Sequence, residues 1–431
     1  MPAGRRPRDQ SIPTLIGALV SVTVLGGLIA DRLGWHLGTA LPPFFASWEP
    51  SLAWAALPVA VLLGASATAA PKLLSPKLRP VLFGAATFGL SLALMLALAL
   101  GRGGGPAVWH AVFGTAPEAS NEYLPALPAV HALGLKAFLD RFAEIAPTLP
   151  IHPSAHPPGL LVLIDALGIR SATQLATLTI GSAALVAPVV YLLGRALMDE
   201  QGARAAALLF VFSPAALIYG ATSADALYAL LGTAAAATLI APRPMIRLLG
   251  PVLLAFASFF SYALLGVGAW AVAVVCQREG LRRAVLLTTV CGLALASLYG
   301  ALFAATGFDP VGAMGSAHFA YTHGIANVRP YSFWVLGSPT AFLVALGLPI
   351  AWYALRALTR RDPAAVALAI IVASASLLGF TKGETERIWL FMVPFACVAA
   401  ARLLPAQRLA PVLGVLAAQA LAVELLFGTV W

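Results

Sequence analysis

The chain has 431 residues, of which 60% are hydrophobic and only 10% charged, and its mean hydropathy is +0.90. Because soluble domains carry about 25% charged residues, this composition excludes an ordinary soluble protein and predicts an all-α polytopic membrane protein. The net charge of +9 could point to nucleic acid, but the distribution of the basic residues makes such a partner unnecessary.

Apolar windows of about 20 residues recur along the chain, as is typical of membrane-spanning helices. We predict thirteen spans, with the N-terminus in the cytoplasm and the C-terminus outside. The first is expected to be a retained helix, because no small-residue cleavage site follows it. The predicted spans are 13–31, 51–70, 80–100, 172–194, 205–221, 224–241, two within 248–276, 284–305, 331–354, 363–380, 388–403 and 409–428.

The basic residues are distributed unevenly between the two predicted sides. The cytoplasmic segments hold 18 of the 26 Lys and Arg residues and five acidic residues, a net charge of +13, whereas the outer segments have a net charge of −4. This asymmetry follows the positive-inside rule, so we expect a multi-pass protein of the cytoplasmic (plasma) membrane. All seven histidines fall in outer segments, which indicates that the active site faces outside.

We divide the chain into an N-terminal cytoplasmic tail with an added transmembrane hairpin (1–79), a main transmembrane module (80–403) and a C-terminal transmembrane helix (404–431). In the main module, about 30 mostly apolar residues separate Arg247 from Arg278, and both arginines are predicted to be cytoplasmic. Because both ends of this segment are basic, we predict two short helices that turn near residues 259–262 rather than one long helix.

The longest non-spanning segment is an outer loop, 101–171. Within it, residues 130–146 place large apolar side chains such as Phe138 on one helical face and charged ones such as Asp140 on the other, which predicts an amphipathic helix. Such a helix lies on the membrane interface or packs against other loops, and the sequence allows both.

A proline-rich stretch, IHPSAHPPGLLVLIDALG, closes this loop. Its last ten residues are apolar but too few to span a bilayer, so they predict a surface or half-inserted helix. His152 and His156 precede it. The prolines around them disfavour a regular helix, and no third ligand has a fixed spacing. We therefore expect the two histidines to line a pocket rather than to bind a metal.

Several charged residues lie where predicted spans meet the outer side. Asp225 begins a span, where it caps the helix or serves function. The turn GFTKGETERIWLF holds Lys382, Glu384, Glu386 and Arg387. Four charges so close to hydrocarbon need partners or a polar cavity. They predict either a site for a lipid phosphate or a turn whose charges pair with one another.

Two further segments of the outer side carry candidate residues. The stretch HFAYTHGIANVRPY places His323, Arg329 and Tyr331 just before a predicted span, where aromatic side chains are expected at the interface. In TAPEASNEYLP, Glu118 and Glu122 have no basic residue within ten positions. A carboxylate in a water-accessible outer cavity can act as a general base on an incoming hydroxyl.

Together these features resemble the GT-C superfamily of integral-membrane glycosyltransferases, especially bacterial members related to protein mannosyltransferases and aminoarabinose transferases. The likeness covers about 80–400 and lies in the acidic outer loop, the amphipathic helix, the HPPGLL turn, the SADAL span boundary and the two-helix hairpin. It differs in two respects. Here the acidic loop follows the third span rather than the first, and SNEYLP offers one acid where the family often has a paired Asp-Glu.

The resemblance implies a GT-C-like bundle and an inverting transfer of sugar from a polyprenyl-phosphate donor to an acceptor hydroxyl on a glycan, lipid or protein. Glu122 would be the base, with Glu118 in reserve, and Lys382, Arg387 and Arg329 would hold the lipid phosphate. The remaining candidate substrate- or phosphate-binding residues are His152, His156, Asp225, Glu384, His323 and Tyr331. No cofactor is required, although a divalent cation is compatible. The alternatives are a transporter or flippase for a lipid or polar solute, and a membrane scaffold.

Overall fold

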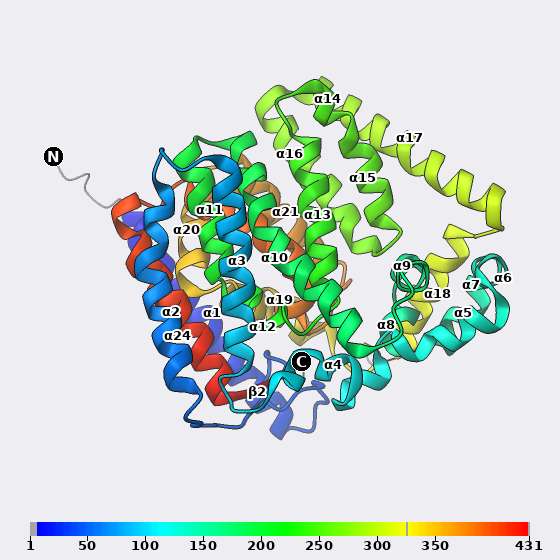
Figure 1. Cartoon of the computed structure of the whole chain (residues 1–431), viewed down its shortest axis with the longest axis horizontal. Helices are drawn as coiled ribbons and strands as arrows, with labels where there is room; N and C mark the ends of the chain where they lie inside the picture. Colours follow the sequence, from blue (N-terminus) through cyan, green and yellow to red (C-terminus); the bar gives the residue numbers. More distant parts are fainter. Residues whose placement is uncertain (1–6, 325, 430–431) are drawn as a thin grey trace.

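A computed structural model describes residues 7–324 and 326–429 of the chain (Figure 1). Most of the described elements are helices. Among the described residues, one small antiparallel sheet is present, formed by β1 (Ala46–Trp48) and β2 (Phe427–Thr429), with Ser47 opposite Gly428. The chain is therefore an all-helical, membrane-type protein in its main architecture, as the composition predicts.

Helices occur along the full length of the described chain. The first half contains α1 (Pro7–Arg32), α2 (Ala56–Ala69), η1 (Ala70–Leu74), α3 (Pro80–Ala99), η2 (Pro106–His110), α4 (Ala111–Gly114), η3 (Pro117–Asn121), η4 (Leu124–Ala126), α5 (Leu127–Leu133), α6 (Leu135–Asp140), α7 (Phe142–Ile145), η5 (Ala146–Thr148), α8 (Ile151–Ser154), α9 (Gly159–Ala166), α10 (Ala172–Leu197), α11 (Glu200–Phe212) and α12 (Pro214–Tyr219). The second half contains α13 (Asp225–Leu239), α14 (Pro244–Arg247), α15 (Leu249–Ser258), η6 (Tyr262–Leu264), α16 (Leu265–Glu279), α17 (Leu281–Thr306), α18 (Pro310–His323), α19 (Tyr331–Ala345), α20 (Leu348–Thr359), α21 (Pro363–Leu377), α22 (Thr385–Ile388), η7 (Trp389–Met392), α23 (Val393–Ala401), η8 (Ala406–Arg408) and α24 (Leu409–Leu426).

Six described helices are long and apolar enough to cross a membrane. A seventh span results if α19 and α20, which meet at a bend of 114°, are counted together. The six are Ser11–Arg32, Ala56–Leu74, Pro80–Ala99, Ala172–Leu197, Leu281–Thr306 and Ala406–Leu426. The chain is thus multi-pass in character, while the count of thirteen spans stays a prediction.

The other predicted spans are short or broken for identifiable reasons. The span predicted at 205–221 is divided at Ser213, where Pro214 starts a new helix. The span predicted at 388–403 is divided into α22, η7 and α23. Helices α13 and α21 have 15 residues each, or about 22 Å at 1.5 Å per residue, against a hydrocarbon core of about 30 Å. Apolar content in the sequence does not reveal these breaks.

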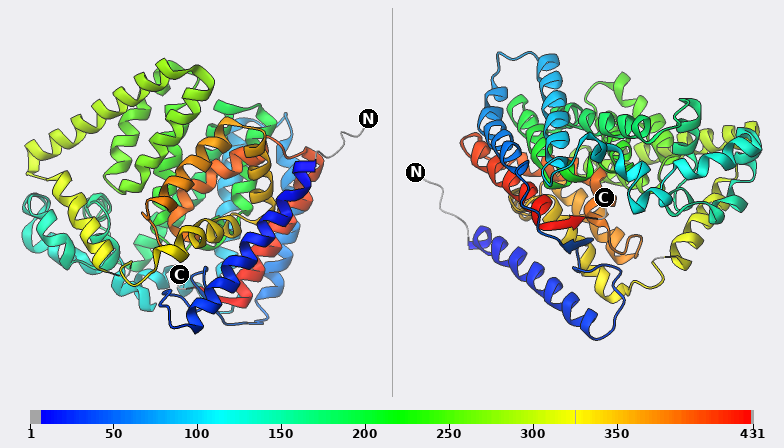
Figure 2. Two further views of the ribbon diagram at one scale, coloured as in Figure 1. Left: turned by 180° about the vertical axis from the view of Figure 1, so that it is seen from behind. Right: turned by 60° about the horizontal axis from the view of Figure 1, so that its bottom comes forward.

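The segment between Arg247 and Arg278 has the two helices predicted for it. Helix α15 ends at Ser258 and α16 begins at Leu265, so the break falls at the predicted turn. Both helices pack against α17. The first two predicted spans join the bundle separately, because α1 packs against α19 and α20 whereas α2 packs against α24. Figure 2 shows α1 at the edge of the bundle.

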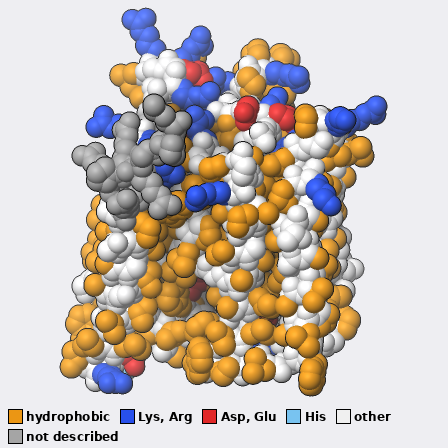
Figure 3. All heavy atoms as spheres, turned by 90° about the vertical axis from the view of Figure 1, so that its left-hand side faces the viewer, with side chains coloured by type: hydrophobic (Ala, Val, Ile, Leu, Met, Phe, Trp, Pro, Cys, Tyr) orange, Lys and Arg blue, Asp and Glu red, His pale blue; other side chains and the backbone are white. Residues whose placement is uncertain are grey.

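The predicted cytoplasmic loops gather at one end of the bundle. Arg278 and Arg402 donate hydrogen bonds to the last carbonyls of α10, at Ala196 and Leu197, where cations complement the helix dipole. Buried Arg204 donates to carbonyls of the α2–α3 connection. In the face drawn in Figure 3, most basic side chains lie at this end, above a broad hydrophobic band.

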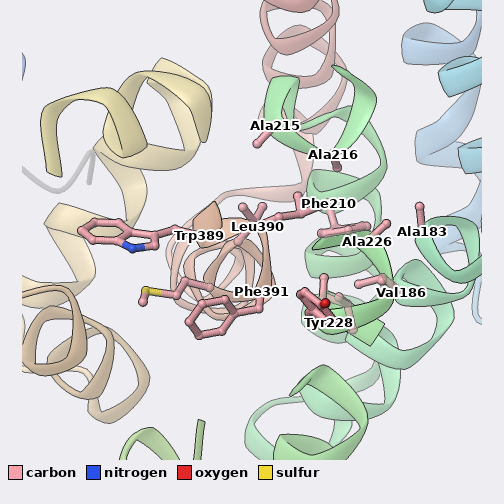
Figure 4. Packing of buried hydrophobic residues seen from close by; sticks show 14 of the residues in the cluster. Ala183, Val186, Phe210, Ala215, Ala216, Ala226, Tyr228, Trp389, Leu390 and Phe391 are labelled. Atoms are coloured by element: carbon pink, nitrogen blue, oxygen red, sulfur yellow. The ribbon is translucent and has the colours of Figure 1, made fainter. Parts of the chain in front are cut away.

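The core of the bundle is built from helices that approach closely. Helices α3, α11 and α13 pack around α10, and α11 also contacts α23. A Cβ atom at Gly194 would lie 2.8 Å from the Cα of Ala203, so the absence of a side chain permits this approach, as in other membrane bundles. Figure 4 shows side chains of η7, including Phe391, meeting Phe210 of α11 and Tyr228 of α13.

The outer loop contains several short helices instead of the single amphipathic helix predicted for 130–146. The helix is interrupted at Gly134, whose φ is +74°, and at Arg141. The predicted faces are nevertheless correct, because Phe138 and Phe142 are buried while Asp140 is exposed. Contacts of this region with α17 and α18 favour packing against neighbouring elements. The prediction of one continuous helix was therefore wrong. The spacing of hydrophobic residues continues across Gly134, but the helical conformation of the backbone ends there.

The apolar stretch after the histidines forms α9, which is eight residues long. Its buried side chains include Leu160 and Leu161. At its start, the N–H of Gly159 donates a hydrogen bond of 2.9 Å to the carbonyl of Phe259. This contact ties the outer loop to the break between α15 and α16 and fixes the position of the histidine-containing segment before it.

Candidate functional site

A buried group of charges joins α13 to the turn before η7. Arg387 of α22 donates a hydrogen bond of 2.7 Å to Oδ2 of Asp225, the first residue of α13. It also donates one of 3.0 Å to Oε2 of Glu384. Oδ2 of Asp225 accepts a second bond, of 2.6 Å, from the hydroxyl of Ser223. Asp225 therefore both begins α13 and binds the charged turn, by which we mean residues 382–387.

A second arginine pairs with the same turn. Arg329 is buried and donates 2.8 Å to Oε1 of Glu384 and 2.7 Å to the carbonyl of Lys382. The ammonium of Lys382 donates 3.1 Å to the carbonyl of Ala326. Within the turn, Glu384 and Arg387 pair with each other in a buried position, whereas Lys382 bonds to a backbone carbonyl. Although burial opposes ionisation, Arg387 and Arg329 lower the pKa of Glu384 below its usual value.

Glu122 lies at the end of η3 and is fully buried. Among the described residues, neither of its carboxylate oxygens has a hydrogen-bond partner. Burial raises its pKa from 4.5 to about 8, against an opposing effect of Arg387, and Asp225 and Glu118 raise it further. The predicted base thus shares an electrostatic environment with the charged turn, and burial keeps it protonated at neutral pH.

The two predicted pocket histidines share the electrostatic environment of Arg387. His152 of α8 and His156 are half-buried, and the ring of His156 lies 5.2 Å from the ring of Tyr228. Burial lowers the pKa of both, with Arg387 contributing in the same direction, and the pKa of His156 falls to about 4. Both imidazoles are therefore neutral near pH 7 and can donate and accept hydrogen bonds.

Three predicted residues lie at the margin of the site or outside it. Glu118 is half-buried and accepts a hydrogen bond of 2.9 Å from Asn121, although it is close enough to affect the pKa of Glu122. His323 is exposed and stacks on Phe319. The exposed Tyr331 donates to the carbonyl of Leu377. None of the described contacts of His323 or Tyr331 is to the charged turn, so the structure gives these two no place in the site.

Residues that were not among the predicted site residues complete the arrangement. The hydroxyls of Tyr123 and Tyr228 lie 2.6 Å apart and are buried. Glu386 is also buried and accepts a hydrogen bond of 2.6 Å from the N–H of Phe45. The sequence contained a signal for the tyrosines, because Tyr123 follows Glu122 and Tyr228 lies one helical turn after Asp225.

The described residues contain no group of three or more His, Cys, Asp or Glu side chains that could hold a metal ion. A divalent cation stays a prediction. Cavities formed by described residues of the bundle include the following two. One, of about 430 Å³, lies at the basic end beside Arg402, and the other, of about 310 Å³, is lined by Glu386. Glu122 lines neither of them.

No protein-family model, no curated protein and no solved structure matches this chain. The site holds a protonated carboxyl group of raised pKa in the electrostatic environment of a guanidinium. Once this carboxyl group has released its proton, the carboxylate can accept one during a reaction.

Proposed function

We propose that the protein is a membrane glycosyltransferase of GT-C-like architecture that moves a sugar from a polyprenyl-phosphate donor to an acceptor hydroxyl, with inversion. Glu122 is the general base of this proposal. The observation that carries it is the burial of the Glu122 carboxyl, without a hydrogen-bond partner among the described residues, in the electrostatic environment of Arg387 and Asp225. Removal of a proton from a hydroxyl requires the ionised form of Glu122, and a pKa of about 8 keeps this form accessible near the working pH.

Arg387 and Arg329 are the proposed phosphate-binding groups. Each is already paired with Glu384, so a lipid phosphate would bind by taking over contacts that this carboxylate now makes. The exchange would leave positive charge next to the leaving phosphate, where it stabilises the transition state. His152 and His156 would hydrogen-bond the sugar or the acceptor, and the neutral state of both rings suits contacts with hydroxyl groups.

The proposed orientation places the site on the extracytoplasmic face of the cytoplasmic membrane. The site lies in predicted outer segments, whereas the arginines that contact the end of α10 belong to predicted cytoplasmic loops. A positive cytoplasmic end is what the positive-inside rule requires. The proposed partners are a polyprenyl-phosphate-linked sugar, a glycan, lipid or protein acceptor and the surrounding membrane lipids, with no nucleic acid.

A transporter or flippase for a lipid or polar solute is the second candidate, and broken helices favour it. The break between α11 and α12 contacts the bend between α19 and α20, where Ser213 donates 3.0 Å to the carbonyl of Leu346. Interrupted helices of this kind form the binding sites of many secondary transporters. The buried carboxyl of Glu122 lies in the outer loop instead, which is why we place this candidate second.

Mass spectrometry of the cell-envelope glycolipids and glycans of a strain lacking the gene distinguishes the two. A transferase predicts the loss of one glycan modification, which returns with the wild-type gene and does not return with Glu122→Gln. A flippase predicts instead that unmodified lipid accumulates on one leaflet while the Glu122→Gln gene complements fully.

A further inference from the structure

An apolar cavity of about 310 Å³ lies between α1, α12, α19 and α24. Its walls include Val20 of α1, Ile218 of α12, Val344 of α19 and Val423 of α24. A volume near 300 Å³ with mostly hydrophobic walls and a few polar groups is typical of a small-molecule site. Because the cavity lies among apolar, membrane-type helices, we expect a hydrocarbon chain to occupy it.

One polar group of the cavity wall is incompletely bonded. Glu386 is 4% exposed, and its Oε1 accepts a hydrogen bond of 2.6 Å from the N–H of Phe45. Its Oε2 is buried and has no partner among the described residues. A buried polar atom without a partner costs free energy, and a ligand in this cavity could satisfy it.

The side-chain amide of Gln419, which also lines the cavity, is already hydrogen-bonded. The amide of Gln419 accepts 3.0 Å from the N–H of Leu348 and donates 2.8 Å to the carbonyl of Val344. It thereby bridges the bend between α19 and α20. The lining includes no Lys or Arg among its described residues, so a phosphate would meet a carboxyl group without a compensating cation.

We propose that this cavity binds the chain of an uncharged, hydroxyl-bearing lipid, with the hydroxyl group hydrogen-bonded to Oε2 of Glu386. The site is independent of sugar transfer and is distinct from the Glu122 carboxyl. Burial raises the pKa of Glu386 to about 7. A hydroxyl group can hydrogen-bond to Glu386 in both of its protonation states, because the hydroxyl donates to the carboxylate and accepts from the protonated carboxyl group.

Photo-crosslinking of the purified full-length chain tests this site. The probes are hexadecanol, hexadecyl phosphate and hexadecane, each with a diazirine at the middle of the chain, and crosslinked residues are mapped by mass spectrometry. We expect hexadecanol to label the walls at Ile218, Val344 or Val423 at least tenfold more than the other two probes. Labelling by the phosphate or the alkane at the level of the alcohol would overturn the proposal.

Two pairs of variants show whether the cavity and the carboxyl are responsible. Ala345→Phe, which fills the cavity, should abolish wall labelling, while Ala301→Phe on the exposed face of α17 should leave it unchanged. Glu386→Leu should lower alcohol labelling to the alkane level, and Glu386→Gln should retain it. Unchanged labelling in Ala345→Phe, for protein that elutes as a single species, would contradict the assignment even if Glu386→Leu failed to fold.

Discussion

Arg387 and Asp225 are 162 positions apart in sequence, yet their side chains form a hydrogen-bonded ion pair of 2.7 Å inside the bundle. The pair connects the start of α13 to the turn after α21. Glu384 and Arg329 extend it into a network. Because burying an uncompensated charge is costly, each buried charge of this network needs its partner, and the ion pairs hold these segments together.

Removal of one member of this pair should strongly destabilise the protein. We expect Arg387→Met to lower the free energy of unfolding by about 3–5 kcal/mol, because Asp225 and Glu384 would remain buried without their cation. Adding Asp225→Asn should recover part of the loss, since the second substitution removes one uncompensated charge. Unfolding in detergent by chemical denaturant measures both effects.

The control for this experiment is Arg283→Ala, at an exposed position of α17, which should change stability little. Strictly additive effects of Arg387→Met and Asp225→Asn would show that the two residues do not interact. That outcome would contradict the network described above.

Much of this site could be predicted from the sequence, because charges are rare in an apolar chain and each one therefore carries information. Asp225, Glu384, Arg329 and Arg387 were all candidates for one outer site, and the structure joins them by hydrogen bonds. The sequence left open whether the charges of the turn at 382–387 pair with one another or bind a lipid phosphate. Pairing depends on distances between segments far apart in the chain, which residue spacing does not report.

The burial of Glu122 should make stability depend on pH. Its pKa in the folded protein is about 8 against a usual 4.5, so the folded state retains a proton that the unfolded state loses. The stabilisation is complete below pH 4.5 and is lost as pH rises to about 8, at up to about 1.4 kcal/mol per pH unit. The difference in unfolding free energy between wild type and Glu122→Gln should therefore change over this range.

Unfolding free energies at pH 5, 6, 7, 8 and 9 test this dependence. Glu118→Gln provides the matched control, because Glu118 is a neighbouring carboxylate that is only half-buried; the pH dependence of this variant should follow that of the wild type. A constant difference between wild type and Glu122→Gln from pH 5 to pH 8 would mean that Glu122 is not a buried, protonated carboxyl.

A methyl group at Gly159 should disturb the attachment of the outer loop. A Cβ atom there would lie 2.3 Å from the carbonyl oxygen of Phe259, and backbone atoms cannot move aside cheaply. We expect Gly159→Ala to cost about 1–3 kcal/mol. Gly181→Ala in α10, where a Cβ atom meets nothing within 4 Å, should be neutral or slightly stabilising. Equal melting temperatures of the two variants would contradict the close approach of α9.

The predicted orientation can be tested with reporter fusions. Gly104 follows α3 at the outer-loop end, and Arg361 lies between α20 and α21. Fusions of alkaline phosphatase and green fluorescent protein at these positions should report opposite sides, with Gly104 outside and Arg361 in the cytoplasm. The same side for both positions would invalidate the topology and the outward-facing site together.

Other features were not predictable from a single sequence, for physical reasons. The docking of Phe45 on Glu386 joins residues 341 positions apart through a backbone N–H, and a backbone donor has no signature in residue type. The interruption at Gly134 lies within continuous hydrophobic spacing. The breaks at Pro214 and before α20 also shorten apolar segments that hydropathy predicts as full spans, although a proline in the first turn of α12 and of α20 marks each break in the sequence. These features depend on backbone geometry and tertiary packing more than on side-chain polarity.

Glu122→Gln tests whether Glu122 is the general base, since the substitution keeps the size of the side chain and removes its ability to take up a proton. The measurement is the initial rate of sugar transfer in membranes supplied with a panel of polyprenyl-phosphate sugars, with folding checked by gel filtration. Our account predicts a loss of about 100-fold or more for Glu122→Gln and near-normal transfer for Glu118→Gln. Wild-type transfer by well-folded Glu122→Gln protein would contradict the account.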